Sequence, residues 1–116
     1  MILIIDDDSA VRSSLSFMLK RAGYEAQVVP GPREAIEVVR TVAPDLILMD
    51  IRMPVMDGIQ ATEKIRTISL TVPIIAVTAY AFYTEQQQAI QAGCNAVISK
   101  PYSLERLKET IESYIG

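Results

Sequence analysis

The chain has 116 residues; half are hydrophobic, 22% are charged and the formal net charge is −3. This length allows one domain with a buried core, and the absence of a dense basic run argues against direct binding of nucleic acid. The sequence contains no histidine. A histidine nucleophile, general base or metal ligand is therefore excluded, and any phosphohistidine chemistry must come from a partner.

One cysteine, Cys94, cannot form an intramolecular disulfide and is typical of a reducing compartment. We expect it to be a small buried residue. The apolar runs are too short to cross a membrane, and residues 1–6 lack the basic region of a signal peptide. These features predict a cytoplasmic protein without membrane contact.

Short apolar runs alternate along the chain with helical patterns. The runs cover residues 2–5, 26–29, 46–49, 74–77 and 96–98. Most are continuous rather than alternating, which is typical of strands covered on both faces. The helical faces carry, in chain order, Val11, Leu15, Met18 and Ala22 before Gly23; Ile36, Val39 and Val42 after Pro32; Ile59, Thr62, Ile65 and Ile68; a Thr84–Gln87 capping box ahead of Gly93; and Leu104, Leu107 and Ile111 after Ser103 as N-cap.

Five strand-then-helix repeats with short joints predict parallel strands joined by right-handed crossovers. The doubly wound order 2-1-3-4-5 is the common α/β arrangement at this size, and a closed eight-unit barrel would need about twice the length. No linker or repeat interrupts the pattern. We therefore expect a single domain over residues 1–116.

Polar residues stand where the apolar runs end. They are Asp6, Asp7 and Asp8 after the first run, Asp50 after the third, Thr78 after the fourth, and Ser99, Lys100 and Pro101 after the fifth. The carboxyl ends of parallel strands share one rim, where ligands bind. Clustered carboxylates repel unless a cation neutralises them, and oxygen ligands alone favour Mg²⁺. With a lysine and a threonine beside them, they are the components of aspartyl-phosphate chemistry.

Each of these residues also has an ordinary interpretation. Three adjacent aspartates are often a solvated helix start, Asp50 alone could be a turn residue, and Lys100 alone is usually a surface charge. Thr78 alone is uninformative. Their joint arrival at one predicted rim favours the site over these alternatives.

Four motifs resemble, in the same order, those of the receiver family, the regulatory domain of response regulators. They are the acidic residues 6–8 after Ile-Ile, the loop LMDIRMPVMDG at residues 48–58, Val-Thr-Ala at 77–79 and Ser-Lys-Pro at 99–101. The resemblance covers the whole chain. It implies a flavodoxin-like (βα)5 three-layer sandwich. It also implies a phosphoacceptor rather than an enzyme with a separate substrate: the domain would promote only its own phosphorylation and dephosphorylation.

The resemblance also implies residue roles. Asp50 would take a phosphoryl group from a phosphohistidine, and Asp6, Asp7 and Asp50 would bind Mg²⁺ together with the backbone carbonyl of Arg52. The hydroxyl of Thr78 and the ammonium of Lys100 would bind phosphoryl oxygens. A cis Lys100–Pro101 bond is expected on the same ground. We expect Gly58 to relieve backbone crowding after Asp50, and Asp8 and Asp57 to start helices without joining the site.

One position departs from the family pattern. Three residues before the lysine the family usually has Tyr or Phe, and here the residue is Val97. Tyr80, Tyr83 or Tyr102 could take part in signalling instead, or could simply pack. In the receiver family, the positions that correspond to Arg52 and Tyr80 tune the rate at which the phosphoryl group is lost. Because both side chains are bulky here, the resemblance implies slow self-dephosphorylation, which a phosphoryl lifetime of seconds would contradict.

The partners implied are a sensor histidine kinase or histidine phosphotransfer protein and an output domain or protein, reached through the face of the fourth helix, fifth strand and fifth helix. A homodimer formed on phosphorylation is left open. Also open is whether the domain stands alone or is part of a response regulator or of a hybrid kinase. Two rivals remain: a haloacid-dehalogenase-type phosphatase with Asp6 as nucleophile, and a pseudo-receiver that is never phosphorylated. The first shares only the initial Asp-x-Asp motif, and the second usually lacks the acidic residues.

Overall fold

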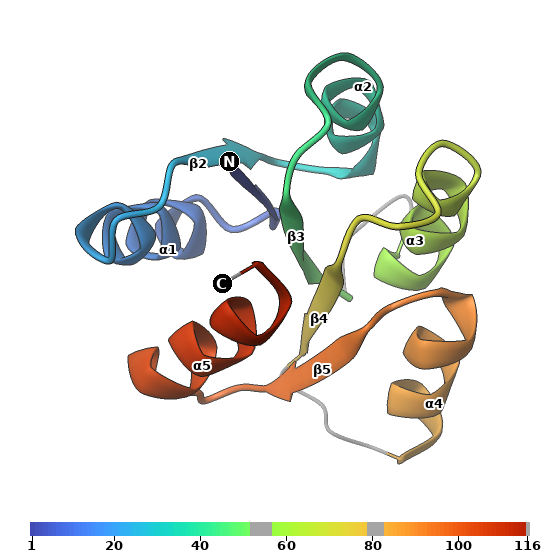
Figure 1. The fold of residues 1–116 in the computed structure, drawn as a ribbon. Helices are drawn as coiled ribbons and strands as arrows, with labels where there is room; N and C mark the ends of the chain where they lie inside the picture. Colours follow the sequence, from blue (N-terminus) through green and yellow to red (C-terminus); the bar gives the residue numbers. More distant parts are fainter. Residues whose placement is uncertain (52–56, 79–82, 116) are drawn as a thin grey trace.

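The computed structural model of the chain describes residues 1–51, 57–78 and 83–115 (Figure 1). Strands and helices alternate in it as the sequence predicts. In chain order they are β1 (Ile2–Ile5), α1 (Ser9–Arg21), β2 (Ala26–Val29), α2 (Pro32–Val42), β3 (Leu46–Asp50), α3 (Gly58–Arg66), β4 (Ile74–Thr78), α4 (Tyr83–Ala92), β5 (Ala96–Ser99) and α5 (Leu104–Ile115).

All five strands are parallel and lie in the order β2-β1-β3-β4-β5. Helices α1 and α5 cover one face of the sheet, and α2, α3 and α4 cover the other (Figure 1). The predicted doubly wound, flavodoxin-like sandwich is thereby confirmed. Within the described ranges, no helix has the length and apolar character that a membrane span requires.

The sheet separates two apolar cores. Leu3, Ile5, Ile47 and Met49 face the α2–α3–α4 side, while the alternate residues of the same strands pack against α1 and α5. Every residue of β1 and β4 is buried, as continuous apolar runs predict. The outer strands β2 and β5 are only partly buried, because each has a neighbouring strand on one side only.

Most helix boundaries follow the predicted signals. The carboxylate of Asp8 accepts hydrogen bonds from the backbone N–H groups of Ala10 and Val11. That of Asp57 accepts one from Gln60, and the hydroxyl of Ser103 accepts one from Arg106. These are ordinary N-caps, so the predicted roles of Asp8, Asp57 and Ser103 in starting helices are confirmed.

Four local predictions are wrong. Thr84 is not an N-cap, because α4 already includes Tyr83. Ile68 lies beyond α3, which ends at Arg66. Two residues predicted on apolar helix faces are exposed: Val42, the last residue of α2, at 55%, and Leu104, the first residue of α5, at 40%, because terminal turns have fewer neighbours than Leu107 further along.

Candidate functional site

The strand register brings the predicted polar residues to one rim of the sheet. Ile5 pairs with Met49, so Asp6 and Asp50 follow at the same level on neighbouring strands. Asp50 pairs with Val77, the residue before Thr78. Thr78 in turn pairs with Ser99, the residue before Lys100. The expectation that these side chains share one rim is therefore met.

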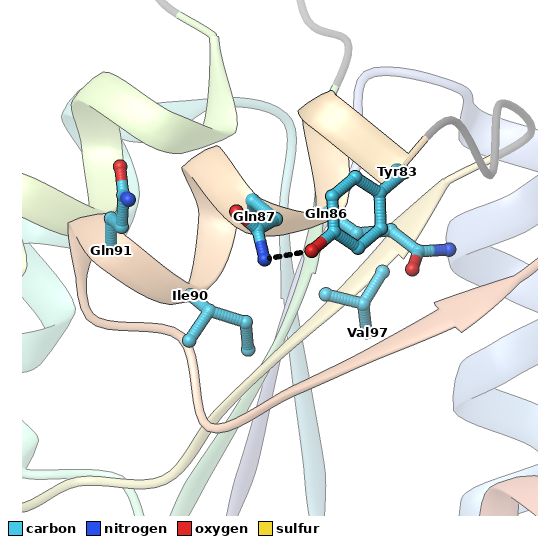
Figure 2. Close-up of a pocket in the computed structure, with 6 residues that line it drawn as sticks. All are labelled: Tyr83, Gln86, Gln87, Ile90, Gln91 and Val97. Carbon is cyan, nitrogen blue, oxygen red and sulfur yellow. Dashed lines mark hydrogen bonds between the residues drawn. The ribbon is translucent and has the colours of Figure 1, made fainter.

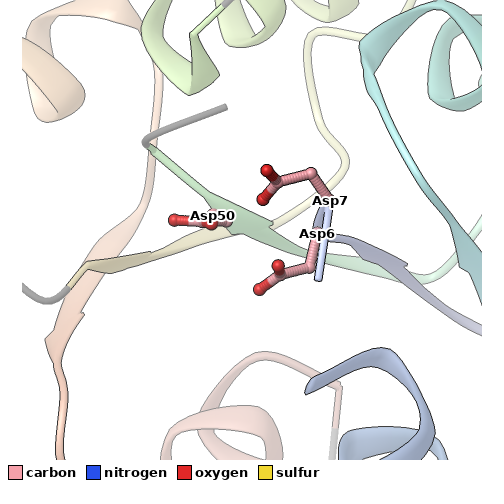
Figure 3. A group of neighbouring side chains, drawn as sticks. All are labelled: Asp6, Asp7 and Asp50. Atoms are coloured by element: carbon pink, nitrogen blue, oxygen red, sulfur yellow. The ribbon is translucent and has the colours of Figure 1, made fainter. Parts of the chain in front are cut away.

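Three carboxylates converge at this rim. One oxygen each of Asp6, Asp7 and Asp50 lies within 4.8 Å of the others, and the side chains point to the same side of the strand ends (Figure 3). Asp6 is buried, Asp50 half-buried and Asp7 exposed. This set of oxygen donors, partly open to solvent, fits a hard divalent cation such as Mg²⁺, which prefers a few carboxylates with water and phosphate oxygens.

Lys100 brings a positive charge to the carboxylates. Its ammonium lies 3.8 Å from Oδ2 of Asp6. Its backbone N–H donates to the carbonyl of Thr78 at 2.7 Å, so the strand ends carrying the two residues are joined directly. Thr78 is fully buried. The Lys100–Pro101 bond is cis, as expected.

Burial is the main influence on Asp6. It raises the pKa of this carboxyl above the usual value, and the charges of Asp7 and Asp8 add to the rise. The backbone N–H of Asp8, which donates to Oδ1 at 2.9 Å, and the ammonium of Lys100 act in the opposite direction. Burial and the charge of Asp6 also raise the pKa of Tyr102. The site therefore favours a nearby cation.

Gly58 has the role predicted for it. A Cβ at this position would lie 2.7 Å from the carbonyl oxygen of Asp50 and from Cα of Ile51, closer than real Cβ atoms come. The backbone N–H of Gly58 also donates to the carbonyl of Ile51 at 2.7 Å. The start of α3 therefore packs directly on the backbone that carries Asp50.

Other predictions have mixed outcomes. Arg52 and Tyr80 lie outside the described residues, so the expected Arg52 carbonyl ligand and the shielding of the phosphoryl group stay predictions. Cys94 is buried and forms no disulfide, and burial raises the pKa of its thiol, as expected of a small core residue. Sequence reasoning missed Arg12, whose guanidinium donates to the backbone carbonyl of Asp6 at 2.9 Å. Its position one turn after the Asp8 cap was the available signal.

Residues 2–112 match the family of response regulator receiver domains. The chain belongs to this family. The receiver is 37% identical over 114 residues to sensor histidine kinase RcsC of Salmonella typhi, covering 98% of this chain and 12% of that kinase. It is also 36% identical over 117 residues to the polar-differentiation response regulator DivK of Brucella anthropi, covering 99% of this chain and 95% of DivK.

Solved structures agree with this assignment. The receiver domain of sensor histidine kinase PA1611 from Pseudomonas aeruginosa is 34% identical, with a TM-score of 0.92 over 99% of this chain and 96% of that one. It is described with a magnesium ion coordinated in its active-site cleft. Chemotaxis protein CheY4 of Vibrio cholerae is 28% identical, with a TM-score of 0.92 over 97% and 96% of the two chains. A two-component phosphoacceptor role is favoured over the phosphatase and the pseudo-receiver.

Proposed function

We propose that this receiver domain accepts a phosphoryl group on Asp50 from the phosphohistidine of a sensor kinase or histidine phosphotransfer protein. The observation that carries the proposal is the convergence of Asp6, Asp7 and Asp50 within 4.8 Å. Beside them, Lys100 is paired with Asp6 and joined to Thr78. This geometry supplies a nucleophile, a site for a cation and two donors at one rim.

In the transfer step, a carboxylate oxygen of Asp50 attacks the phosphorus of the phosphohistidine. The O–P bond forms as the P–N bond breaks, and the imidazole nitrogen leaves with the electron pair. The hydroxyl of Thr78 and the ammonium of Lys100 donate to the phosphoryl oxygens and offset their negative charge. Hydrolysis reverses the change: water attacks the phosphorus, and Asp50 leaves as a carboxylate. Both steps take place on the domain itself.

Asp6, Asp7 and Asp50 would hold Mg²⁺, with the backbone carbonyl of Arg52 as a fourth protein ligand. When bound, the ion supplies positive charge for the phosphoryl oxygens and relieves repulsion among the carboxylates. The oxygen-only donor set of this chain supports this choice of metal. Asp7, the most exposed of the three, would be the direct ligand, and Asp6, whose Oδ1 already accepts from the Asp8 N–H, would act partly through water.

A labelling experiment tests the proposal. The protein is incubated with acetyl phosphate and Mg²⁺, any acyl phosphate is reduced with borohydride, and the modified residue is mapped by mass spectrometry. We expect modification of Asp50 and none in Asp50→Asn, while Asp57→Asn, which keeps an N-cap seven residues away, still reacts. Modification of Asp6 would instead support a phosphatase, and no modification a pseudo-receiver.

The output surface proposed for this domain is the face formed by α4, β5 and α5. A pocket of about 360 Å³ on this face is lined by Tyr83, Gln86, Gln87, Ile90, Gln91 and Val97. Figure 2 shows the hydroxyl of Tyr83 accepting a hydrogen bond from the amide of Gln87 at 2.8 Å. Ile90 and Tyr83 are exposed. An aromatic ring beside the short Val97 supports Tyr83 as the residue that takes part in signalling.

We also propose that residues 1–116 form one receiver domain, either in a longer kinase or in a regulator. The family match over residues 2–112 and the single sheet support this assignment. Receiver domains act with histidine kinases and with output domains or proteins. A homodimer that forms on phosphorylation would be detected as a larger sedimentation coefficient of the protein in the presence of acetyl phosphate than in its absence.

A further inference from the structure

The backbone that carries the acidic residues is fixed at several points. The N–H of Asp6 donates to the carbonyl of Val29 at 3.3 Å. One oxygen of its side chain accepts from the N–H of Asp8 at 2.9 Å, and the other faces Lys100 at 3.8 Å. The fourth polar group, the carbonyl of Asp6, accepts from Nη1 of Arg12 at 2.9 Å. Each polar group of Asp6 thus has a partner.

Asp7 lies between two residues that are held in place. On its C-terminal side, Asp8 is fixed by its bond to Asp6 and by capping α1 at Ala10 and Val11. On its N-terminal side, the carbonyl that accepts from Arg12 belongs to the peptide bond joining Asp6 to Asp7. The direction of the Asp7 side chain therefore depends on a peptide plane whose oxygen Arg12 binds.

We propose that Arg12 is a positioning residue for the metal site. It holds the Asp6–Asp7 peptide so that the exposed carboxylate of Asp7 already faces Asp50 before a cation arrives. A charge-assisted hydrogen bond from a guanidinium, half-buried against the strand end, fixes this plane more firmly than solvent would. Preorganised ligands lose less conformational entropy on binding, so Arg12 raises the affinity for Mg²⁺. The inference rests on the proposed Mg²⁺ site.

The direction in which substitution of Arg12 changes Mg²⁺ affinity distinguishes a positioning role from a purely electrostatic one. A positive side chain near a cation site repels the cation, so loss of the charge alone would tighten Mg²⁺ binding. Loss of the hydrogen bond to the peptide would weaken it. Arg12→Gln removes both, and positioning is supported only if the net effect is weaker binding.

The test is titration of Mg²⁺ by calorimetry into metal-free wild type, Arg12→Gln, Arg12→Lys and Arg21→Gln, well below their melting temperatures. We expect Kd for Mg²⁺ to rise about three- to tenfold in Arg12→Gln, the size expected for loss of one hydrogen bond. Arg12→Lys keeps the charge and one N–H donor for the single bond that Nη1 makes to the Asp6 carbonyl, but on a more flexible stem, so its Kd should fall between those of Arg12→Gln and wild type. Arg21→Gln, at the far end of the same helix, should bind as wild type does.

A second measurement does not depend on metal. In EDTA, hydrogen exchange at the amides of residues 7 and 8 should be faster in Arg12→Gln than in wild type, while exchange in β3 is unchanged. Unchanged or tighter Mg²⁺ binding in Arg12→Gln would overturn the proposal, as would equal weakening in Arg21→Gln. Wild type that binds no Mg²⁺ would contradict the proposed site itself. If Arg12→Gln does not fold, Arg12→Lys gives the same comparison with a smaller shift.

Discussion

Asp6 is a buried carboxylate that is well hydrogen-bonded and still has a raised pKa. Its side chain is 5% exposed, and burial outweighs the Asp8 amide and the Lys100 ammonium. Ionised Asp6 therefore costs the metal-free protein free energy of folding. A cation at the rim would offset this cost. Lys100 lowers the pKa of Asp6 by less than burial raises it, so ionised Asp6 favours binding of a further positive charge.

The raised pKa of Asp6 predicts a pH-dependent effect of Asp6→Asn. A raised folded pKa means that the stability from the protonated form is fully present below the unfolded pKa and is lost as pH rises through the folded pKa. Asparagine resembles the protonated form, so in EDTA at pH 7 Asp6→Asn should have the larger free energy of unfolding. The difference from wild type should shrink as the pH is lowered through the raised pKa of Asp6 towards the pKa of an unfolded aspartate. Urea unfolding across this range measures it, and a difference that grows on acidification would contradict the assignment.

Gly58 gives a prediction with a matched control. Gly58→Ala places a Cβ 2.7 Å from backbone atoms of Asp50 and Ile51, which cannot move as a flexible side chain can. We expect it to lower the free energy of unfolding by about 1–3 kcal/mol and to slow labelling of Asp50. In Gly31→Ala the new Cβ meets only the end of the Glu34 side chain, at 3.4 Å. Urea unfolding measures the free energy of unfolding of both variants. An equal decrease in Gly58→Ala and Gly31→Ala would contradict the predicted clash at Gly58.

At the scale of elements, Arg66 joins the far ends of α3, α4 and β4. Its Nε and Nη2 donate to the carbonyl of Gly93 at 3.1 and 2.8 Å, and Nη1 donates to those of Val72 and Ser69 at 2.7 and 3.2 Å. Nη2 also donates to the side-chain oxygen of Asn95 at 2.9 Å. The C-terminal ends of α3 and α4 are therefore anchored together at the rim opposite Asp50 and Thr78.

Arg66→Met should lower the free energy of unfolding by about 2–4 kcal/mol, because several partly buried carbonyls lose a charged donor together. Lys64→Met, which removes an exposed cation from the same helix, is the control and should change stability by less than about 0.5 kcal/mol. Urea unfolding of the two variants measures the difference. Comparable losses would show that the Arg66 contacts are weak.

The parts of this structure that the sequence predicted are those governed by local pattern. Continuous apolar runs and residues such as Asp8 and Ser103 identify the strands and helix starts, and strand ends identify Asp6 and Asp50. Arg66 could not be found this way, since its acceptors lie up to 29 residues along the chain. The prediction of Thr84 as an N-cap is wrong because the capping-box pattern of residues can also occur by chance inside a helix, where the sequence alone does not distinguish it from one at the helix start.

Over the whole molecule, charge is distributed unevenly. The net charge is only −3, yet three carboxylates share the rim within 4.8 Å. Their repulsion destabilises the metal-free fold, and a bound cation removes it. Stability should therefore respond to Mg²⁺ and to loss of any one of the three charges.

In EDTA, Asp50→Asn should melt at a higher temperature than wild type, because one of the like charges is gone. Addition of Mg²⁺ should raise the Tm of wild type, by linkage of binding to folding worth about 2.7 kcal/mol at 100 times Kd, and raise that of Asp50→Asn less. Differential scanning calorimetry gives both values. Asp57→Asn removes a charge outside the cluster and should respond to Mg²⁺ as wild type does; a lower metal-free Tm for Asp50→Asn would count against the clustered-charge account.

The bond from the Lys100 N–H to the Thr78 carbonyl has a consequence for how receivers diversify. Together with the Thr78–Ser99 pairing, it holds the ends of β4 and β5 side by side, and α4 lies between these two strands in the sequence. On the output face proposed above, changes of sequence on the outer surface of α4 would alter partner choice, while the strand pairing and this hydrogen bond keep the spacing of Thr78 and Lys100. Chimeras that exchange the exposed residues of α4 between receivers should therefore redirect signalling without rebuilding the phosphoacceptor chemistry.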